Sequence, residues 1–287
     1  MSLRRPRSRR PAPRRRSRAP TIRAVTRLGI ITGSGTYALP GFEGSGPRAV
    51  ETRFGEARVS EGRFAGVDVV HVSRHWEGHP RLSSHVDHRS NVTALREAGV
   101  DAILAVTVCG ACDPSLELGT LIVFDDLHFL SNRLPDGSLC SLYAEGERRR
   151  GHWIFETPFS GPLRAALLTG ARQAGHAVRD GGVYGHVDGP RFNTRTEIAS
   201  LAAAGVTAVS QTGGPETVLA GEAEIPYALV GYATDYANGV RDEPTPVDEL
   251  IRLIGASTDT FATTLAAAVP IAAAAELAPV GTHFRFD

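Results

Sequence analysis

Residues 28–36 read Leu-Gly-Ile-Ile-Thr-Gly-Ser-Gly-Thr, a short apolar run followed at once by glycines and hydroxyl groups. A run of this length that ends in Gly and Ser is typical of a buried strand and the turn after it. Glycines let the backbone approach an anion, and the hydroxyl of Ser34 can donate to it. A P-loop would need Lys after the second glycine, and Pro40-Gly41 interrupts the helix that a dinucleotide fingerprint requires. The stretch therefore predicts a strand with a polar site at its carboxyl end.

The rest of the chain alternates short apolar runs with amphipathic stretches. We predict further strands at Val67–Val72, Ala102–Thr107, Leu121–Phe124, Val206–Ser210 and Tyr227–Ala233. We predict helices at Ser90–Ala98, Pro162–Ala174, Thr196–Ala204 and Val247–Val269, and a long polar loop over residues 132–150. This alternation indicates an α/β domain, in which ligands bind beyond the carboxyl ends of the strands.

The charge is unevenly distributed along the chain. Residues 1–27 contain 11 Arg and no acidic residue, which leaves 20 Arg against 31 Asp and Glu in the remainder. We expect residues 1–27 to form a disordered Arg/Pro-rich tail and residues 28–287 to form one catalytic domain. Nucleic-acid binding or organellar targeting by the tail stays open, although a solvated extension is favoured. No apolar run approaches the ~20 residues of a membrane span, so we expect none.

The cysteines and histidines do not form an evident metal site. Three cysteines argue against a disulfide scaffold and for a reducing, cytoplasmic environment. Cys109 and Cys112 form a C-x-x-C pair, but no second ligand pair accompanies them, so we expect a packed, unreactive pair. His71, His75 and His79 would form a metal-binding stripe only on a helix, and they straddle a predicted strand end.

Polar residues follow several predicted strands. Arg74 and His75 come after the second strand, and a guanidinium beside an imidazole suits a phosphate group. The segments 107–110 and 211–216 follow two other strands and offer hydroxyls and glycine amides to a polar ligand. Each motif alone also fits a simple turn or a surface ion pair. Their shared position at strand ends favours one binding site.

Two further motifs carry groups suited to an aromatic ligand and to acid catalysis. Phe192, in the segment 188–193, offers a stacking face for a planar ring, although a core position is the ordinary role of a single Phe. Asp235 ends an apolar strand, where burial raises the pKa of a carboxyl group and makes it a candidate acid. A structural cap is the alternative for Asp235.

Over residues 29–269 the chain resembles the trimeric purine nucleoside phosphorylases, and within them the 5′-methylthioadenosine phosphorylases. The resemblance rests on GIITGSG (29–35), SRH (73–75), VTVCG (106–110), DGPRFNTRTE (188–197), TGGPETVLA (212–220) and ATDY (233–236). It implies a single domain with a central mixed β-sheet flanked by helices, assembled as a homotrimer. It also implies phosphorolysis with inorganic phosphate as co-substrate and with neither metal nor organic cofactor.

The resemblance assigns roles to named residues. Phosphate would be held by Ser34, Arg74, His75, Thr107 and Thr212. The base and ribose would contact Val108, Cys109, Gly110, Phe192, Asn193, Gln211 and Asp235. Asp235 would be the catalytic acid that protonates N7 of the purine. Val247, and His152 lent by a neighbouring subunit, would line the pocket for the 5′-substituent.

Three positions favour an adenosine with an uncharged 5′ group. The 6-oxopurine branch carries Glu, Asn and His where this chain has Asn193, Asp235 and Val247. An apolar side chain at 247 gains from burying a methylthio group and leaves a hydroxyl unpaired. We therefore expect phosphorolysis of 5′-methylthioadenosine or a related 5′-modified adenosine, for example 5′-halo, to adenine and a 5-substituted ribose 1-phosphate.

Departures from the family pattern leave the natural substrate open. Gln211 replaces the usual Met beside the ribose, Ala237 replaces an Asp after ATDY, and Trp76 stands where Gly is common. The nearest alternative is a 6-oxopurine nucleoside or methylthioinosine phosphorylase. A hydrolytic nucleosidase and a nucleoside-binding protein without turnover are the others.

Overall fold

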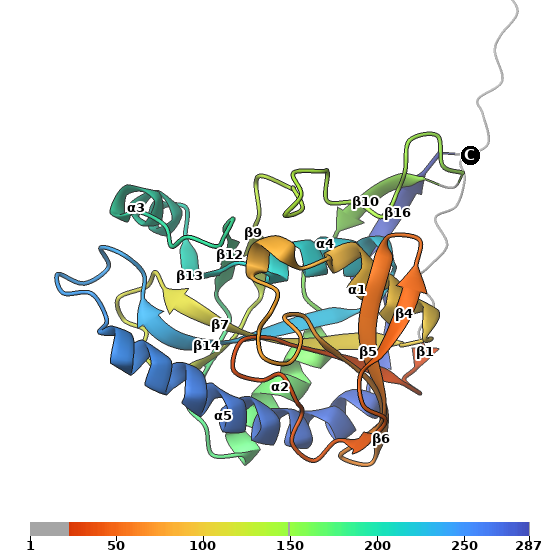
Figure 1. The fold of residues 1–287 in the computed structure, drawn as a ribbon, viewed down its shortest axis with the longest axis horizontal. Helices are drawn as coiled ribbons and strands as arrows, with labels where there is room; N and C mark the ends of the chain where they lie inside the picture. The colour runs from red at the N-terminus through yellow and green to blue at the C-terminus, as the bar shows by residue number, and fades with distance from the viewer. Residues whose placement is uncertain (1–22, 149, 287) are drawn as a thin grey trace, which may run out of the picture.

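The computed structural model describes residues 23–148 and 150–286, which form one α/β domain (Figure 1). Most of the predicted tail lies outside these residues. The predicted boundary at residue 27 is too late, because Arg23–Ala24 forms strand β1, paired with β15 (Glu276–Leu277). The backbone and hydroxyl of Thr26 also donate to Asp101 at 2.7 and 2.9 Å. These contacts attach residues 23–27 to the folded domain.

A twelve-stranded mixed sheet forms the centre of the molecule. Its main path runs in the order β11 (Val178–Asp180), β8 (Leu121–Val123), β14 (Tyr227–Tyr236), β7 (Ala102–Ala111), β2 (Leu28–Thr32), β6 (Val67–Ser73), β5 (Gly55–Phe64), β3 (Glu43–Gly44). Four strands pair beside this path: β4 (Arg48–Thr52), β9 (Asp126–His128), β12 (Val183–His186) and β13 (Val206–Ser210). The pairs β2–β6, β2–β7 and β7–β14 are parallel, so their carboxyl ends meet at one edge.

Helices cover both faces of the sheet, as the α/β pattern predicts. In Figure 1, α2 (Gly161–Gln173) and α5 (Val247–Ala273) lie on one face, and α1 (His88–Glu97) and α4 (Gly213–Glu222) lie on the other. Successive side chains of a strand point to opposite faces. In β2, Ile30 therefore packs with the α2 and α5 core, and Ile31 packs with the α1 and α4 core. Burial on both faces explains why the central strands are continuously apolar.

Smaller elements complete the domain. The helix α3 (Arg195–Ala203) contacts β13 away from the main layers, and β10 (Gly151–Phe155) pairs with β16 (Gly281–Arg285) as a separate ribbon. Residues 132–148 form the predicted loop, with one isolated bridge between Arg133 and Leu139. Within the described ranges, no helix has the length and apolar character needed to cross a membrane.

Candidate active site

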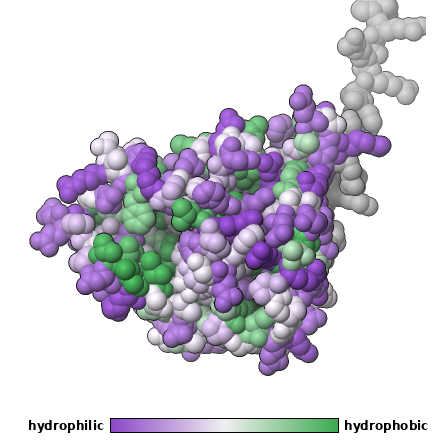
Figure 2. Space-filling model, in the orientation of Figure 1, coloured by the Kyte–Doolittle hydropathy of each residue, from purple (hydrophilic) through white to green (hydrophobic). Residues whose placement is uncertain are grey.

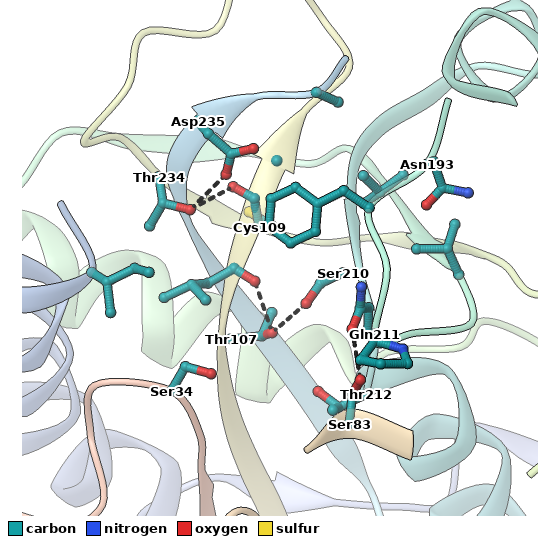
Figure 3. Close-up of a pocket in the computed structure, with 18 of the residues that line it drawn as sticks. Ser34, Ser83, Thr107, Cys109, Asn193, Ser210, Gln211, Thr212, Thr234 and Asp235 are labelled. Atoms are coloured by element: carbon teal, nitrogen blue, oxygen red, sulfur yellow. Dashed lines mark hydrogen bonds between the residues drawn. The ribbon is translucent and has the colours of Figure 1, made fainter. Parts of the chain in front are cut away.

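A pocket of about 290 Å³ opens at the carboxyl ends of the central strands. All of the predicted phosphate, base and ribose residues line it: Ser34, Arg74, His75, Thr107, Val108, Cys109, Gly110, Phe192, Asn193, Gln211, Thr212 and Asp235. Figure 3 shows Asp235 and Cys109 at one end, Ser34 at another, and Gln211 and Ser83 on the opposite wall. The sequence motifs therefore converge on one pocket, as their shared position at strand ends predicts.

Strands β7 and β14 extend past the residues that end the predicted strands. Their parallel pairing continues to Tyr236 and Ala111, with a register shift between Ala233 and Asp235. Bulges of this kind re-aim side chains next to active sites. Here the shift brings Asp235 against Gly110, where an added β-carbon would lie 3.1 Å from the Asp235 Oδ2 atom. Glycine at 110 thus leaves room for the carboxyl group.

Asp235 is the carboxyl group at the upper end of the pocket in Figure 3. Its Oδ1 accepts a 2.9 Å hydrogen bond from the hydroxyl of Thr234. Burial raises the pKa of Asp235, and the Thr234 hydrogen bond only partly opposes this. A partly desolvated carboxyl group holds its proton more firmly than an exposed one and is a candidate donor to a basic ligand atom.

The cysteines beside Asp235 behave as the sequence predicts. Cys109, Cys112 and Cys140 are free and buried. Burial raises the pKa of the Cys112 thiol to about 12 and that of Cys109 well above its usual value. Because the thiolate is the reactive form, these thiols are unreactive near neutral pH. The prediction of a packed, unreactive pair is confirmed.

Arg74 is buried, with 1% of its surface exposed, and is held from behind by Glu216. Its Nε and Nη2 atoms donate to the two carboxylate oxygens of Glu216 at 2.7 and 2.9 Å, and Nη1 donates to the Val106 carbonyl at 2.8 Å. A guanidinium has five N–H donors, so two remain for the pocket. The surface ion pair considered from sequence is excluded. Glu216 was not identified as its partner, because the two are 142 residues apart.

Glu216 stays ionised although it is buried. Burial alone would raise its pKa, but the charge and hydrogen bonds of Arg74, with the His88 ring 3.6 Å away, outweigh this and lower the pKa to about 2. The hydroxyl of Tyr227 also donates to Glu216 at 3.0 Å. The carboxylate therefore fixes the guanidinium plane before any ligand arrives.

His75 is neutral and oriented by the backbone. Its Nδ1 lies 2.8 Å from the Arg81 carbonyl, which can only accept, so Nδ1 carries the proton. Burial, reinforced by the charge of Arg74, lowers the pKa of His75 to about 3. The remaining Nε2 is then a hydrogen-bond acceptor. Such an atom can accept a hydrogen bond from the hydroxyl of a hydrogen phosphate.

The opposite wall of the pocket is a loop that carries Phe192. The ring is 61% exposed and lines the pocket, so Phe192 is not a core residue, and its role as a stacking face stays a prediction. The loop leads into α3, whose capping box joins Thr194 and Glu197. The side-chain amide of Asn193 donates to Glu197 at 3.2 Å, which turns it toward the helix start.

Comparison with known proteins shows the family to which the chain belongs. A model of the phosphorylase superfamily matches residues 27–270. The chain belongs to the phosphorylase superfamily. It is 30% identical to the 6-oxopurine nucleoside phosphorylase of Pyrococcus furiosus, over 86% of this chain and 93% of that protein. It is 32% identical to the S-methyl-5′-thioadenosine phosphorylase of Bradyrhizobium diazoefficiens, over 81% and 79%.

Solved structures agree with this membership. The methylthioadenosine phosphorylase of Schistosoma mansoni in complex with adenine superposes with a TM-score of 0.78 at 28% identity, covering 86% of this chain and 91% of that one. The protein is thus a pentosyltransferase of the nucleoside phosphorylase type, on the methylthioadenosine phosphorylase branch. The predicted mixed-sheet fold and family are confirmed.

Two predicted site residues of the phosphorylase do not line the pocket. Val247 is 69% exposed at the start of α5, while Leu250 and Ile254 of the same helix line the pocket wall. Figure 2 shows a hydrophobic patch over this part of α5. His152 lies on β10, edge-on to Phe286, in a second hollow of about 890 Å³. Its role across a subunit interface stays a prediction.

Leu250, Ile254 and Ser83 are pocket residues that sequence reasoning missed. The helical spacing of Val247, Leu250 and Ile254 was a usable signal, since positions 3 and 7 residues apart share a helix face. Ser83 lies in the short 3₁₀ turn Ser83–His85, and only the fold brings that turn to the pocket.

Proposed function

We propose that this phosphorylase cleaves 5′-methylthioadenosine, or a related adenosine with an uncharged 5′ group, into adenine and a 5-substituted ribose 1-phosphate. Inorganic phosphate is the co-substrate, and the reaction needs no metal or organic cofactor. The observation that carries the proposal is Asp235, a half-buried carboxyl group of raised pKa that faces a pocket walled by an exposed Phe ring.

The reaction begins with phosphate held at the buried end of the pocket. Arg74 offers its two free N–H groups, and the hydroxyls of Ser34, Thr107 and Thr212 offer further donors. Neutral His75 accepts a hydrogen bond from a protonated oxygen of the anion through Nε2. This arrangement orients one phosphate oxygen toward the ribose before the bond breaks.

Cleavage of the glycosidic bond places positive charge on the ribose and negative charge on the base. The phosphate stabilises the ribosyl cation and attacks C1′ from the face opposite the departing purine, which inverts that carbon. Asp235 donates its proton to N7, and the bond electrons leave with adenine as a neutral product. Phe192 stacks on the ring, which orients N7 toward Asp235.

The 5′ preference follows from the wall contributed by α5. Leu250 and Ile254 present apolar side chains, which gain by burying a methylthio or halogen group and leave a hydroxyl without a partner. We also propose a cytoplasmic homotrimer in which His152 of each subunit completes a neighbour's 5′ pocket. Sedimentation equilibrium tests the trimer, and a monomer that is fully active would contradict it.

The decisive assay measures base release from a panel of nucleosides with and without phosphate. The panel contains 5′-methylthio-, 5′-chloro-, 5′-fluoro-, 5′-deoxy- and unmodified adenosine, with inosine and methylthioinosine as 6-oxopurine members. We expect phosphate-dependent adenine release that is fastest for an uncharged 5′ substituent. Fast inosine cleavage would favour the 6-oxopurine alternative, which the Pyrococcus relative represents. Turnover without phosphate would indicate a hydrolase, and binding without release a non-enzymatic role.

A further inference from the structure

Two segments far apart in the sequence are joined across the pocket wall by the side chain of Gln211. Its Oε1 accepts a 2.6 Å hydrogen bond from the hydroxyl of Ser83, which lies 128 residues away. Its Nε2 donates to the carbonyl of Arg191 at 3.1 Å. Both ends of the carboxamide are therefore used within the protein. We call this chain of contacts from Ser83 through Gln211 to Arg191 the Gln211 bridge.

The bridge is packed tightly against the backbone of the loop that carries Phe192. A β-carbon at Gly189 would overlap both the Gln211 Oε1 and the Ser83 Oγ atoms. Only glycine permits an approach this close. The loop thus rests directly on the bridge, and Figure 3 shows Gln211 beside Ser83 on the pocket wall.

The other side-chain attachments of this loop are either exposed or lie after Phe192 in the chain. Arg191 pairs with Glu197 at 2.7 Å, but both side chains are largely exposed, and water and salt screen such a pair so that it contributes little. The amide of Asn238 donates to the Asn193 carbonyl at 2.7 Å, after Phe192 in the chain. The Gln211 bridge holds the part of the loop that precedes Phe192 and ties it to the pocket wall.

We propose that Gln211 is a positioning residue, whose bridge to Ser83 and Arg191 fixes the Phe192 wall at the distance that a stacked purine requires. The inference rests on the proposed function, because it takes Phe192 as the stacking ring. The bridge also gives a reason for Gln at position 211, where the family usually has Met. A Met side chain could fill the same space but could neither accept from Ser83 nor donate to Arg191.

The bridge leads to an ordered series of effects. Gln211→Met removes both hydrogen bonds, Gln211→Glu keeps the acceptor for Ser83, and Ser83→Ala removes one bond only. A half-buried hydrogen bond contributes a net amount that corresponds to roughly 2- to 10-fold in an equilibrium constant. We therefore expect Gln211→Met to weaken adenine binding about 5- to 10-fold, with Gln211→Glu and Ser83→Ala each weakening it about 2- to 3-fold.

The test uses the full chain and three readouts. Isothermal titration with adenine gives base affinity, steady-state kinetics give KM for nucleoside and for phosphate, and hydrogen exchange reports on residues 188–193. We expect Gln211→Met to raise the nucleoside KM with kcat within about twofold and phosphate KM unchanged, and to speed exchange in the loop. In the double variant with Ser83→Ala, adenine affinity should equal that of Gln211→Met alone, because the shared bond is already lost.

Several outcomes would overturn the inference. Adenine affinity of Gln211→Met equal to wild type excludes a positioning role, and so does an equal loss in phosphate and adenine binding. Fully multiplicative effects of Gln211→Met and Ser83→Ala would show that the two do not act through one bridge. If the wild type bound no purine and released none, the proposed function would fail. If hydrogen exchange in the loop were unchanged in Gln211→Met, the inference about the Gln211 bridge would fail while the proposed function stood.

Discussion

The two halves of the pocket are built in opposite ways. At the phosphate end, Arg74, His75, Thr107 and Glu216 are buried, and each is held by hydrogen bonds within the protein. At the base end, Phe192 projects from a loop held by half-exposed side chains. An anion needs donors that are already oriented in a region of low dielectric, since reorganising them would cost stabilisation. A planar base needs an accessible ring face, which an exposed loop provides.

The same contrast appears in the ion pairs. Arg74 and Glu216 are both buried, and removal of one partner of such a pair costs ~3–5 kcal/mol. The exposed Arg191–Glu197 pair at the base end contributes far less. The phosphate end is therefore part of the folding core, whereas the base end can change without loss of the fold. Of the departures from the family pattern, Gln211 and Ala237 lie toward the base and ribose, whereas Trp76 directly follows Arg74 and His75 at the phosphate end.

The largest expected effect is on catalysis at the base end. Asp235→Asn keeps the shape of the side chain but removes the proton donor, and we expect kcat to fall ~100-fold or more. The stability of the fold should change little. Phosphorolysis of the best nucleoside from the panel measures the effect. The control is Asp188→Asn, an exposed carboxyl of the Phe192 loop. A loss within about threefold, or ~0.65 kcal/mol, would exclude Asp235 as the acid.

The second prediction addresses the buried pair at the phosphate end. Glu216→Gln leaves the charge of Arg74 without its counterion, so we expect a loss of ~3 kcal/mol in the free energy of unfolding and a higher phosphate KM. Urea denaturation and kinetics measure the two quantities. Glu222→Gln, on the same helix and outside the pocket, is the matched control and should leave phosphate KM unchanged.

The pH dependence of stability sharpens this second prediction. The pKa of Glu216 is lowered from 4.5 to about 2 in the folded state. The contribution of ionised Glu216 to the free energy of unfolding is therefore present above pH 4.5 and is lost as the pH falls toward 2. Stability of the wild type should decline more steeply than that of Glu216→Gln over this window. Parallel curves for the two proteins would contradict the ion-pair argument.

The sequence predicted where the strands around the pocket begin, but it did not predict the full length of every strand. Leu28–Thr32 and Val206–Ser210 match the structure residue for residue, because turn residues follow each apolar run. Strands β7 and β14 continue through Cys109–Ala111 and Thr234–Tyr236, where polar residues and Gly resemble a turn. Only pairing with neighbouring strands keeps these residues extended.

Helix α4 was predicted only through its start in the segment 211–216, and not over its length, for a related reason. It begins at Gly213-Gly214-Pro215, which local propensity assigns to a turn. That helix carries Glu216, so the incompletely predicted helix also concealed the partner of Arg74. The strand β5 was missed because charged residues alternate with its buried Ala57 and Val59. Contacts between residues more than 100 positions apart, such as Ser83 with Gln211, have no local signal at all.

The third prediction uses pH to separate the two halves. If protonated Asp235 is the acid, kcat at saturating phosphate should fall as the pH rises above its raised pKa, approaching tenfold per pH unit. His75, at the phosphate end, should cause no loss of kcat on the acid side above about pH 3, because its imidazole stays neutral down to that pH. Asp235→Asn should abolish the alkaline limb. An alkaline limb that persists in this variant would assign it to another group.

The smallest expected effect concerns the 5′ wall, where the sequence pointed to Val247 and the pocket contains Leu250. Leu250→Ser removes apolar surface that would contact the substituent, so we expect kcat/KM for 5′-methylthioadenosine to fall about fivefold relative to that for adenosine. Val247→Ser should change that ratio less than twofold, since Val247 is largely exposed in the single chain. Competition between the two nucleosides measures the ratio directly. A larger effect at Val247 than at Leu250 would mean that Val247 is covered in the active protein. A neighbouring subunit would cover it in this way, and assembly of subunits would then complete the open side of the pocket.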